Sequence, residues 1–191
     1  MSIKDKIKWD KKYNNTPALL MPRDPSTKLV QIIDNIQGKK ALDIACGTGK
    51  NSIYLAKKGF EIEALDISQV ALDNLNNQGY KSINTKLVDL DCYIPTPNRY
   101  DIIVMTNFLD RNIIPHLKLA LKKDALLLIE TYMDHKVNEK PSSNPDFLLK
   151  AAELKTFFDE DFEILEYDQF LNESNELYKM MKQSIIVRKK I

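Results

Sequence analysis

The stretch Lys40–Ser68, KALDIACGTGKNSIYLAKKGFEIEALDIS, combines the signals that decide the fold. An apolar run with one acid leads into a turn that contains Gly47 and Gly49, a helical segment follows, and a second apolar run ends at Asp66. This is the strand, glycine turn, helix, strand and acid order of a nucleotide-binding βαβ unit. We therefore predict a nucleoside ligand at the glycine turn, with the Asp66 carboxylate accepting hydrogen bonds from both ribose hydroxyls.

The details of the turn argue against a dinucleotide. A dinucleotide-binding turn has the pattern G-x-G-x-x-G, in which the third glycine eases helix-to-strand packing. Ser52 stands at that third position, and Asp43 lies within the strand, four residues before Gly47. We expect the Asp43 carboxylate to face the ligand, which favours a ligand with an ammonium and a sulfonium and disfavours a pyrophosphate. The alternative is an ordinary βαβ turn without a ligand, since glycine pairs also occur there.

The composition is that of a globular protein without a charge bias. The chain has 191 residues, of which 43% are hydrophobic and 29% charged, with a net charge of +1. These values fit one domain, residues 1–191, and give no reason to expect nucleic acid or a membrane as partner. Two cysteines are too few for a disulfide framework, and two histidines without a cysteine pair give no metal site. We expect a cytoplasmic protein, either a monomer or a weak homodimer.

Helical and strand patterns alternate along most of the chain. Strands are predicted at residues 41–45, 60–65, 83–90, 100–105, 125–131, 162–167 and 184–187, and helices at 25–37, 50–58, 69–78, 114–122 and 147–158. This order predicts an α/β fold: a doubly wound, mostly parallel seven-stranded sheet with helices on both faces and an antiparallel C-terminal strand.

Five segments carry a resemblance to a known family. The motif D-x-A-C-G-T-G at residues 43–49 resembles the cofactor loop of class I S-adenosylmethionine-dependent methyltransferases. More narrowly, the chain is similar to small bacterial methyltransferases of the tellurite-resistance type, in W-x-x-K-Y from Trp9, NFLDRNIIPHL, ETY and KPSSNPDFLL. The resemblance covers the chain from about Trp9 to its end and implies a Rossmann-like methyltransferase fold. At Lys122–Ala125 such proteins usually have Lys-Pro-Gly-Gly, a departure that we expect to change a turn and not the site.

The resemblance implies S-adenosyl-L-methionine as the cofactor and in-line methyl transfer to an unidentified small-molecule acceptor. The implied cofactor-binding residues are Trp9, Lys12, Tyr13, Asp43, Ala45, Cys46, Gly47, Gly49, Asn51, Asp66, Ile67, Asp89, Leu90, Thr106 and Asn107. Asp89 is the acid that the resemblance places at the adenine amino group, and a solvated loop acid is the alternative. Cys46 is expected to contribute its backbone.

Two segments are expected to close the ligand-binding edge of the sheet. Residues 1–38 form a predicted N-terminal helical cover, in which Trp9 and Tyr13 share a helical face. They either dock on the core or lie over the cofactor, with Lys12 reaching its methionyl carboxylate. Residues 132–145 are polar and irregular, which is typical of a lid.

The sequence leaves the catalytic residues open. A thiol, an amine or an oxyanion acceptor needs no general base, whereas a hydroxyl acceptor does, and His135 and Asp110 are the candidates. Arg111 would bind an anionic acceptor or pair with Asp110. Two other functions stay open beside methyl transfer: a non-catalytic protein that binds S-adenosylmethionine, and a nicotinamide-dependent oxidoreductase.

Overall fold

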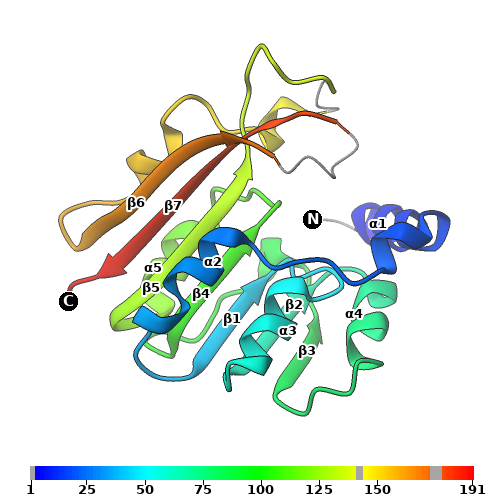
Figure 1. Ribbon diagram of the computed structural model, residues 1–191, viewed down its shortest axis with the longest axis horizontal. Coiled ribbons are helices and arrows are strands. Elements are labelled where there is room, and N and C mark those ends of the chain that lie inside the picture. The colour runs from blue at the N-terminus through cyan, green and yellow to red at the C-terminus, as the bar shows by residue number, and fades with distance from the viewer. Residues whose placement is uncertain (1–2, 141–143, 173–177) are drawn as a thin grey trace.

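The computed structural model describes residues 3–140, 144–172 and 178–191, and its seven strands form one sheet (Figure 1). The strands lie in the order β3-β2-β1-β4-β5-β7-β6. β1 to β5 run parallel, and β7 pairs antiparallel with both β5 and β6. Their bounds are β1 Lys40–Ile44, β2 Glu61–Asp66, β3 Ile83–Leu87, β4 Tyr100–Thr106, β5 Leu121–Tyr132, β6 Phe162–Leu171 and β7 Met181–Lys189.

Helices cover both faces of this sheet (Figure 1). α2, α3 and α4 pack on one face and α5 on the other, while α1 lies beside α4. The α-helices are α1 Ile3–Asn15, α2 Thr27–Ile32, α3 Lys50–Lys57, α4 Gln69–Asn76 and α5 Ile114–Ala120. The 3-10 helices are η1 Pro17–Leu20, η2 Ile33–Asn35, η3 Leu90–Cys92, η4 Pro145–Phe147 and η5 Glu153–Phe157. The predicted doubly wound, seven-stranded α/β fold is confirmed.

The core is split by the sheet into two layers. In β4, Ile102 and Val104 pack toward α2 and α3, whereas Ile103 and Met105 pack toward α5. Strands that are covered on both faces need apolar residues at nearly every position, which is why the run from Tyr100 is buried throughout. Because side chains alternate between the two faces along a strand, each polar residue at the carboxyl end of a strand can be assigned to one of the two faces of the sheet.

Two predicted elements are wrong in the structure. No α-helix forms over 147–158, where the structure has only the end of η4 and the 3-10 helix η5. Arg111 donates hydrogen bonds to the main-chain oxygens of Asp146 and Leu148, which an α-helix would need for its own bonds. Residues 122–125, where we expected a changed turn, lie within β5 at a register shift against β4, and Asp124 takes a left-handed backbone conformation there with φ of +63°. β5 therefore begins at Leu121, and the predicted helix ends at Ala120 instead of Lys122.

Candidate active site

The loop after β1 is held in an unusual backbone conformation. Ala45, Gly47 and Gly49 all have positive φ, at +53°, +56° and +82°. For Ala45 this left-handed conformation is strained, since its Cβ crowds the backbone. A Cβ on Gly49 would lie 2.3 Å from the Leu75 side chain, so this glycine lets α3 start against α4. A Cβ on Gly47 would lie 2.8 Å from the Tyr13 hydroxyl, so the N-terminal helix approaches the loop at Gly47.

Asp66 ties this loop to the next one. Its Oδ2 accepts a hydrogen bond of 2.7 Å from the Gly47 N–H, and its Oδ1 accepts one of 2.8 Å from the Ser68 N–H. Burial raises the pKa of the carboxyl, although these two bonds and one from Ile67 oppose the shift. The carboxylate has four lone pairs and three main-chain donors, so it can accept one further hydrogen bond. A ribose hydroxyl could therefore bind Asp66 without breaking the loop.

Asp43 is buried beneath the first turn of α3. The Ser52 hydroxyl donates a hydrogen bond of 2.6 Å to its Oδ2. Burial raises the pKa of Asp43 to about 7, against the effect of the Ser52 bonds, and the nearby Asp66 carboxylate adds to the rise. A cationic ligand near this carboxyl would favour its ionised form.

The N-terminal helix α1 packs beside α4 and reaches the glycine loop at Gly47, a position compatible with both predicted arrangements. The Asp10 carboxylate accepts a 2.6 Å hydrogen bond from the Ser68 hydroxyl, which anchors α1 to the start of α4. Tyr13 is 7% exposed, and its ring centroid lies 6.0 Å from that of Trp9. Lys12 Nζ lies 4.3 Å from the Trp9 ring centroid. Trp9 and Tyr13 thus form one aromatic pair, the roof, whose Tyr13 hydroxyl lies next to Gly47.

Positive charges gather beside this roof. Burial and the charges of Lys140, Lys8 and Arg23 lower the pKa of the Lys12 ammonium. Lys140 belongs to the predicted lid, whereas Lys8 and Lys12 belong to α1. The lid and α1 are therefore within electrostatic reach of each other, and an anionic group such as a carboxylate is favoured between them.

Asn51 and Thr106 link the loop to the end of β4. The Asn51 amide donates a 2.9 Å hydrogen bond to the Thr106 hydroxyl, and its oxygen accepts one of 3.0 Å from the Ser26 N–H. The Ser26 hydroxyl donates to Glu130 at 2.6 Å, and Glu130 pairs with Lys182 at 3.2 Å. All five side chains are buried. The segment before α2, α3, and three strands therefore meet in one polar network.

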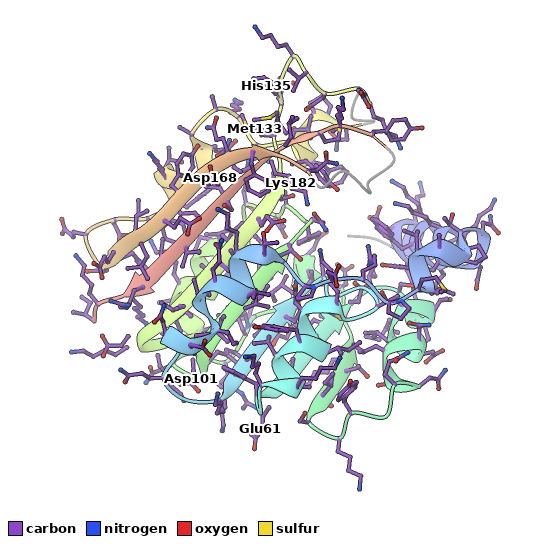
Figure 2. The ribbon with its side chains drawn as sticks, viewed as in Figure 1. Glu61, Asp101, Met133, His135, Asp168 and Lys182 are labelled. Carbon is purple, nitrogen blue, oxygen red and sulfur yellow. The ribbon has the colours of Figure 1, made fainter. Side chains whose placement is uncertain are left out.

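Ser26, Glu130 and Lys182 were not predicted from the sequence. A signal for Glu130 was present, because it follows the apolar run Ala125–Ile129 directly, at the predicted ligand edge. Lys182 carried no such signal in the sequence, because it lies in a polar part of the chain. Figure 2 shows Lys182 at the start of β7, beside the end of β5.

The other predicted cofactor residues also lie at the carboxyl ends of the strands. Ile67 and Leu90 are buried, and the Cys46 N–H donates to Leu65 O at 2.9 Å. The Asp89 carboxylate accepts a 3.1 Å bond from the Asp91 N–H. Asn107 is exposed and has a φ of +57°, so β4, like β1, is followed by a left-handed residue that is not glycine. Such strain clusters at functional sites.

A cavity of about 620 Å³ opens beside this set. Its lining comes from α1 (Asp5), the η3 helix (Asp91), the segment after β4 (Phe108–Asn112) and the segment 146–153 (Asp146, Phe147, Lys150 and Glu153). None of these described residues belongs to the predicted cofactor set, but Asp91 follows Leu90 and Phe108 follows Asn107 directly. The cavity therefore adjoins the cofactor set without overlapping it.

The three catalytic candidates separate in the structure. Asp110 and Arg111 line the cavity, and His135 is not among its described lining residues. His135 lies in the loop beyond Met133 (Figure 2), where its Nδ1 accepts a 3.3 Å hydrogen bond from the Val137 N–H. The geometry thus brings Asp110 to the cavity and leaves His135 outside its described lining.

Arg111 pairs with Glu153 and not with Asp110. Its Nε and Nη2 donate to the two Glu153 carboxylate oxygens at 2.6 and 3.1 Å. Nη1 donates to Asp146 O at 2.6 Å, and Nη2 also donates to Leu148 O at 3.0 Å. The hydrogen bonds to Glu153 raise the pKa of Arg111, to which the Asp146 carboxylate adds. Arg111 therefore holds the segment 146–153 in place as one wall of the cavity.

The predicted lid is anchored at its start and near its middle. The Asp134 N–H donates to Leu149 O at 2.8 Å, and the Leu149 N–H donates to Tyr132 O at 3.0 Å. The Met181 N–H donates to Asn138 Oδ1 at 2.8 Å, which fastens the lid to the start of β7. Residues 141–143 of the predicted lid lie outside the described residues. In the described part of the chain, the cavity wall is formed by the segment after this lid.

Comparison with known proteins decides the family. The family model described as "Tellurite resistance protein TehB" matches residues 1–189. The chain belongs to the TehB family. A curated relative, "Probable S-adenosyl-L-methionine-dependent methyltransferase TehB" of Haemophilus influenzae, is 29% identical over 95% of this chain. The chain spans 66% of that relative's length. The family resemblance stated from the sequence is thus confirmed.

Solved structures agree on the fold. The crystal structure of TehB from Haemophilus influenzae aligns with a TM-score of 0.73 at 28% identity, covering 97% of this chain and 67% of that one. A methyltransferase structure from Methanosarcina mazei aligns at 0.69 with 20% identity, covering 88% of this chain and 100% of that one. The [4+2]-cyclase SpnF aligns at 0.70 with 15% identity, covering 97% and 96%. The last two show the fold alone.

Two further observations bear on other functions. No helix in residues 3–140, 144–172 and 178–191 is long and apolar enough to cross a membrane. Within the same residues, no three His, Cys, Asp or Glu side chains gather closely enough to hold a metal ion.

Proposed function

We propose that this TehB-family chain is an S-adenosyl-L-methionine-dependent methyltransferase that acts on a small molecule. The observation that carries the proposal is the geometry of Asp66, which joins the glycine loop to the start of α4 at the carboxyl end of β2. With three main-chain donors bound, its carboxylate can still accept a hydrogen bond from a ribose hydroxyl. The name of the Haemophilus influenzae relative supports the same reading.

The residues present fit this cofactor. Asp66 would hold the ribose, and Asp89, Leu90 and Ile67 would surround the base. The charges near Lys12 would attract the methionyl carboxylate, while Asp43 offers a negative charge on the other side of the loop. A pyrophosphate, by contrast, would meet the carboxylates of Asp43 and Asp66, so a nicotinamide dinucleotide fits poorly.

Methyl transfer requires the protein mainly to orient the cofactor and the acceptor relative to each other. When bound, the cofactor supplies a methyl group made electrophilic by its sulfonium. The Trp9–Tyr13 roof would exclude water from above the loop, and the cavity next to Asn107 would hold the acceptor in line with the methyl group. Asp110 lines that cavity and is the group placed to receive a proton if the acceptor is a hydroxyl.

A second candidate function has a specific observation in its favour. The cyclase SpnF has this fold, so the fold is compatible with chemistry other than methyl transfer. A chain that binds S-adenosylmethionine without transferring its methyl group would show the same loop and the same Asp66.

Binding and turnover separate the possibilities. Calorimetric titration should show binding of S-adenosylhomocysteine, the demethylated cofactor, and no measurable binding of NAD or NADP. Incubation with methyl-labelled cofactor and a metabolite extract should transfer the label to a small molecule. Binding without transfer would favour the non-catalytic function, and micromolar NAD affinity would contradict the proposal.

We also place the protein in the cytoplasm. Both Cys46 and Cys92 are free thiols, and Cys92 is exposed. An exposed thiol suits a reducing compartment. Labelling of Cys92 by a membrane-impermeant reagent in intact cells would contradict this location.

A further inference from the structure

The residues proposed to bind the cofactor are covered in this structure, and their cover carries a further inference that rests on the proposed function. Asp66 is 7% exposed, and Gly47 is buried. The Tyr13 hydroxyl of α1 lies 2.8 Å from the position that a Cβ on Gly47 would take. Tyr13 therefore occupies this side of the glycine loop, and a ligand that approaches the main chain there has to displace α1.

Few buried side chains attach α1 to the rest of the protein. Figure 1 shows this helix outside the sheet, beside α4. Among residues 4–15, the part of α1 whose burial the structure describes, Tyr13 is the one buried residue, and Ile7 is 61% exposed. A segment with three prolines follows, and the next α-helix begins at Thr27. Because elements with few buried contacts open at a low free energy, α1 can separate from the loop while the sheet stays folded.

Asp10 joins α1 to α4 by two hydrogen bonds, which we call the latch. Its Oδ1 accepts a bond of 2.6 Å from the Ser68 hydroxyl and one of 3.3 Å from the Val70 N–H, both at the start of α4. The Lys6 ammonium, one turn earlier in α1, donates to Oδ2 at 2.8 Å. A hydroxyl-to-carboxylate bond as short as that from Ser68 is stronger than a bond between neutral groups.

The latch is connected directly to the proposed ribose acceptor. The Ser68 N–H donates to Asp66 Oδ1 at 2.8 Å, while the hydroxyl of the same serine donates to Asp10. The other Asp66 oxygen accepts from the Gly47 N–H. Asp66 thus bonds to Gly47 and Ser68, and α1 contacts the same two residues through Tyr13 and Asp10. In this closed arrangement α1 lies directly against the carboxylate that the ribose would bind.

We propose that Asp10 is a positioning residue for the cofactor: its latch holds α1 over Gly47 and Asp66, and it breaks each time the cofactor enters or leaves. The latch stabilises the closed form of the free protein and of the cofactor-bound protein, so it slows entry and release alike. Its loss raises both rate constants and changes the equilibrium affinity by much less. A side chain that only stabilised the fold or only shaped the site would not raise the association rate constant.

Stopped-flow mixing with S-adenosylhomocysteine measures both rate constants through the emission of Trp9, the single tryptophan and a neighbour of Tyr13. Asp10→Ala should raise both at least about tenfold, because hydrogen bonds to a charged group are lost. Lys6→Ala is the matched control: it removes the ion pair within α1, keeps the latch, and should change both by less than about threefold. An unchanged or lower association rate constant in Asp10→Ala would overturn the proposal. So would Trp9 emission that stays constant when calorimetry shows saturation.

Hydrogen exchange tests the latch without a ligand. The amides of α1 should exchange at least about tenfold faster in Asp10→Ala than in the wild type, with those of α3 unchanged. Ser68→Ala breaks the latch from the α4 side and keeps the main-chain N–H that binds Asp66, so it should accelerate the same amides. In that background, Asp10→Ala should add at most about threefold.

The two measurements separate the latch from the proposed function. Exchange of the α1 amides that Asp10→Ala leaves at the wild-type rate would contradict the latch, whatever the cofactor does. Faster exchange in Asp10→Ala, together with no binding of S-adenosylhomocysteine to the wild type, would support α1 opening and count against the proposed function alone.

Discussion

The two halves of the proposed ligand-binding edge are built from different kinds of contact. In the cofactor half, the carboxyl ends of β1 to β3 with their loops, the bonds of Asp43 and Asp66 join residues of one contiguous stretch, 43–68, such as Asp43 with Ser52. In the acceptor half, the carboxyl ends of β4 and β5 with the segment 146–153, they join distant residues, such as Arg111 with Glu153. The two halves meet in the buried network of Asn51 and Thr106, and no residue of that network is among the described residues that line the cavity. We therefore expect the acceptor half to tolerate changes in its lining without disturbing the cofactor half. Four sets of variants test this difference between the two halves.

The largest effect is expected at the buried pair of Glu130 and Lys182. Lys182→Met leaves the Glu130 carboxylate buried without its cation, which should lower the free energy of unfolding by about 3–5 kcal/mol. The double variant with Glu130→Gln should recover much of this loss. Chemical denaturation measures both, with the exposed Lys81→Met as control. Stability of Lys182→Met equal to the wild type would refute the role of the pair.

Substitution of Asp66 should give the next largest effect, a loss of cofactor affinity that arises in the cofactor half alone. Asp66→Ala removes the acceptor for a ribose hydroxyl and should weaken S-adenosylhomocysteine binding by about 1.5–3 kcal/mol. Some stability is lost as well, because the Gly47 and Ser68 N–H groups lose their partner. Calorimetry on the folded variant is the measurement, and the exposed Asp73→Ala is the control. Wild-type affinity in a folded Asp66→Ala protein would contradict the assignment.

Arg111 tests the acceptor half. Arg111→Gln breaks the charged bonds to Glu153 and should destabilise the segment 146–153 by about 1–2 kcal/mol. Hydrogen exchange should accelerate at the amides of that segment, while affinity for S-adenosylhomocysteine stays within about twofold. Arg99→Gln, at a surface ion pair with Glu63, is the matched control. A large loss of cofactor affinity would show that the halves are coupled.

The smallest effect compares one left-handed alanine from each half. Ala45 and Ala152 have φ of +53° and +56°, a conformation that costs a residue with a Cβ about 1–2 kcal/mol. Glycine removes this strain, but it also loses more conformational entropy on folding, which costs about 0.5–1 kcal/mol. Ala45→Gly and Ala152→Gly should therefore be neutral or stabilising by up to about 1 kcal/mol. Ala56→Gly, inside α3, should cost about 1 kcal/mol. A similar cost at Ala45 would rule out strain there.

The same contrast explains what the sequence could predict. The strand, glycine turn and acid around Asp66 are contiguous, so their pattern is visible locally and the fold follows from it. The helix predicted over 147–158 rested on the apolar residues Leu148, Leu149, Ala152 and Leu154. In the structure Leu149 and Leu154 are buried without an α-helix, so their spacing also fits an irregular wall. What decides between the two is Arg111, which lies 35 residues before Asp146 and leaves no local signal. The Glu130–Lys182 pair, 52 residues apart, is hidden for the same reason.

The most direct test of the division into two halves is an amide NMR titration with S-adenosylhomocysteine. The chain has five glycines, so the signals of Gly47 and Gly49 are easily resolved. The account predicts large shifts at Gly47, Gly49 and Ile67, and small ones at Lys150 and Glu153 in the cavity wall. Large shifts confined to the cavity wall, with Gly47 and Gly49 unmoved, would contradict it.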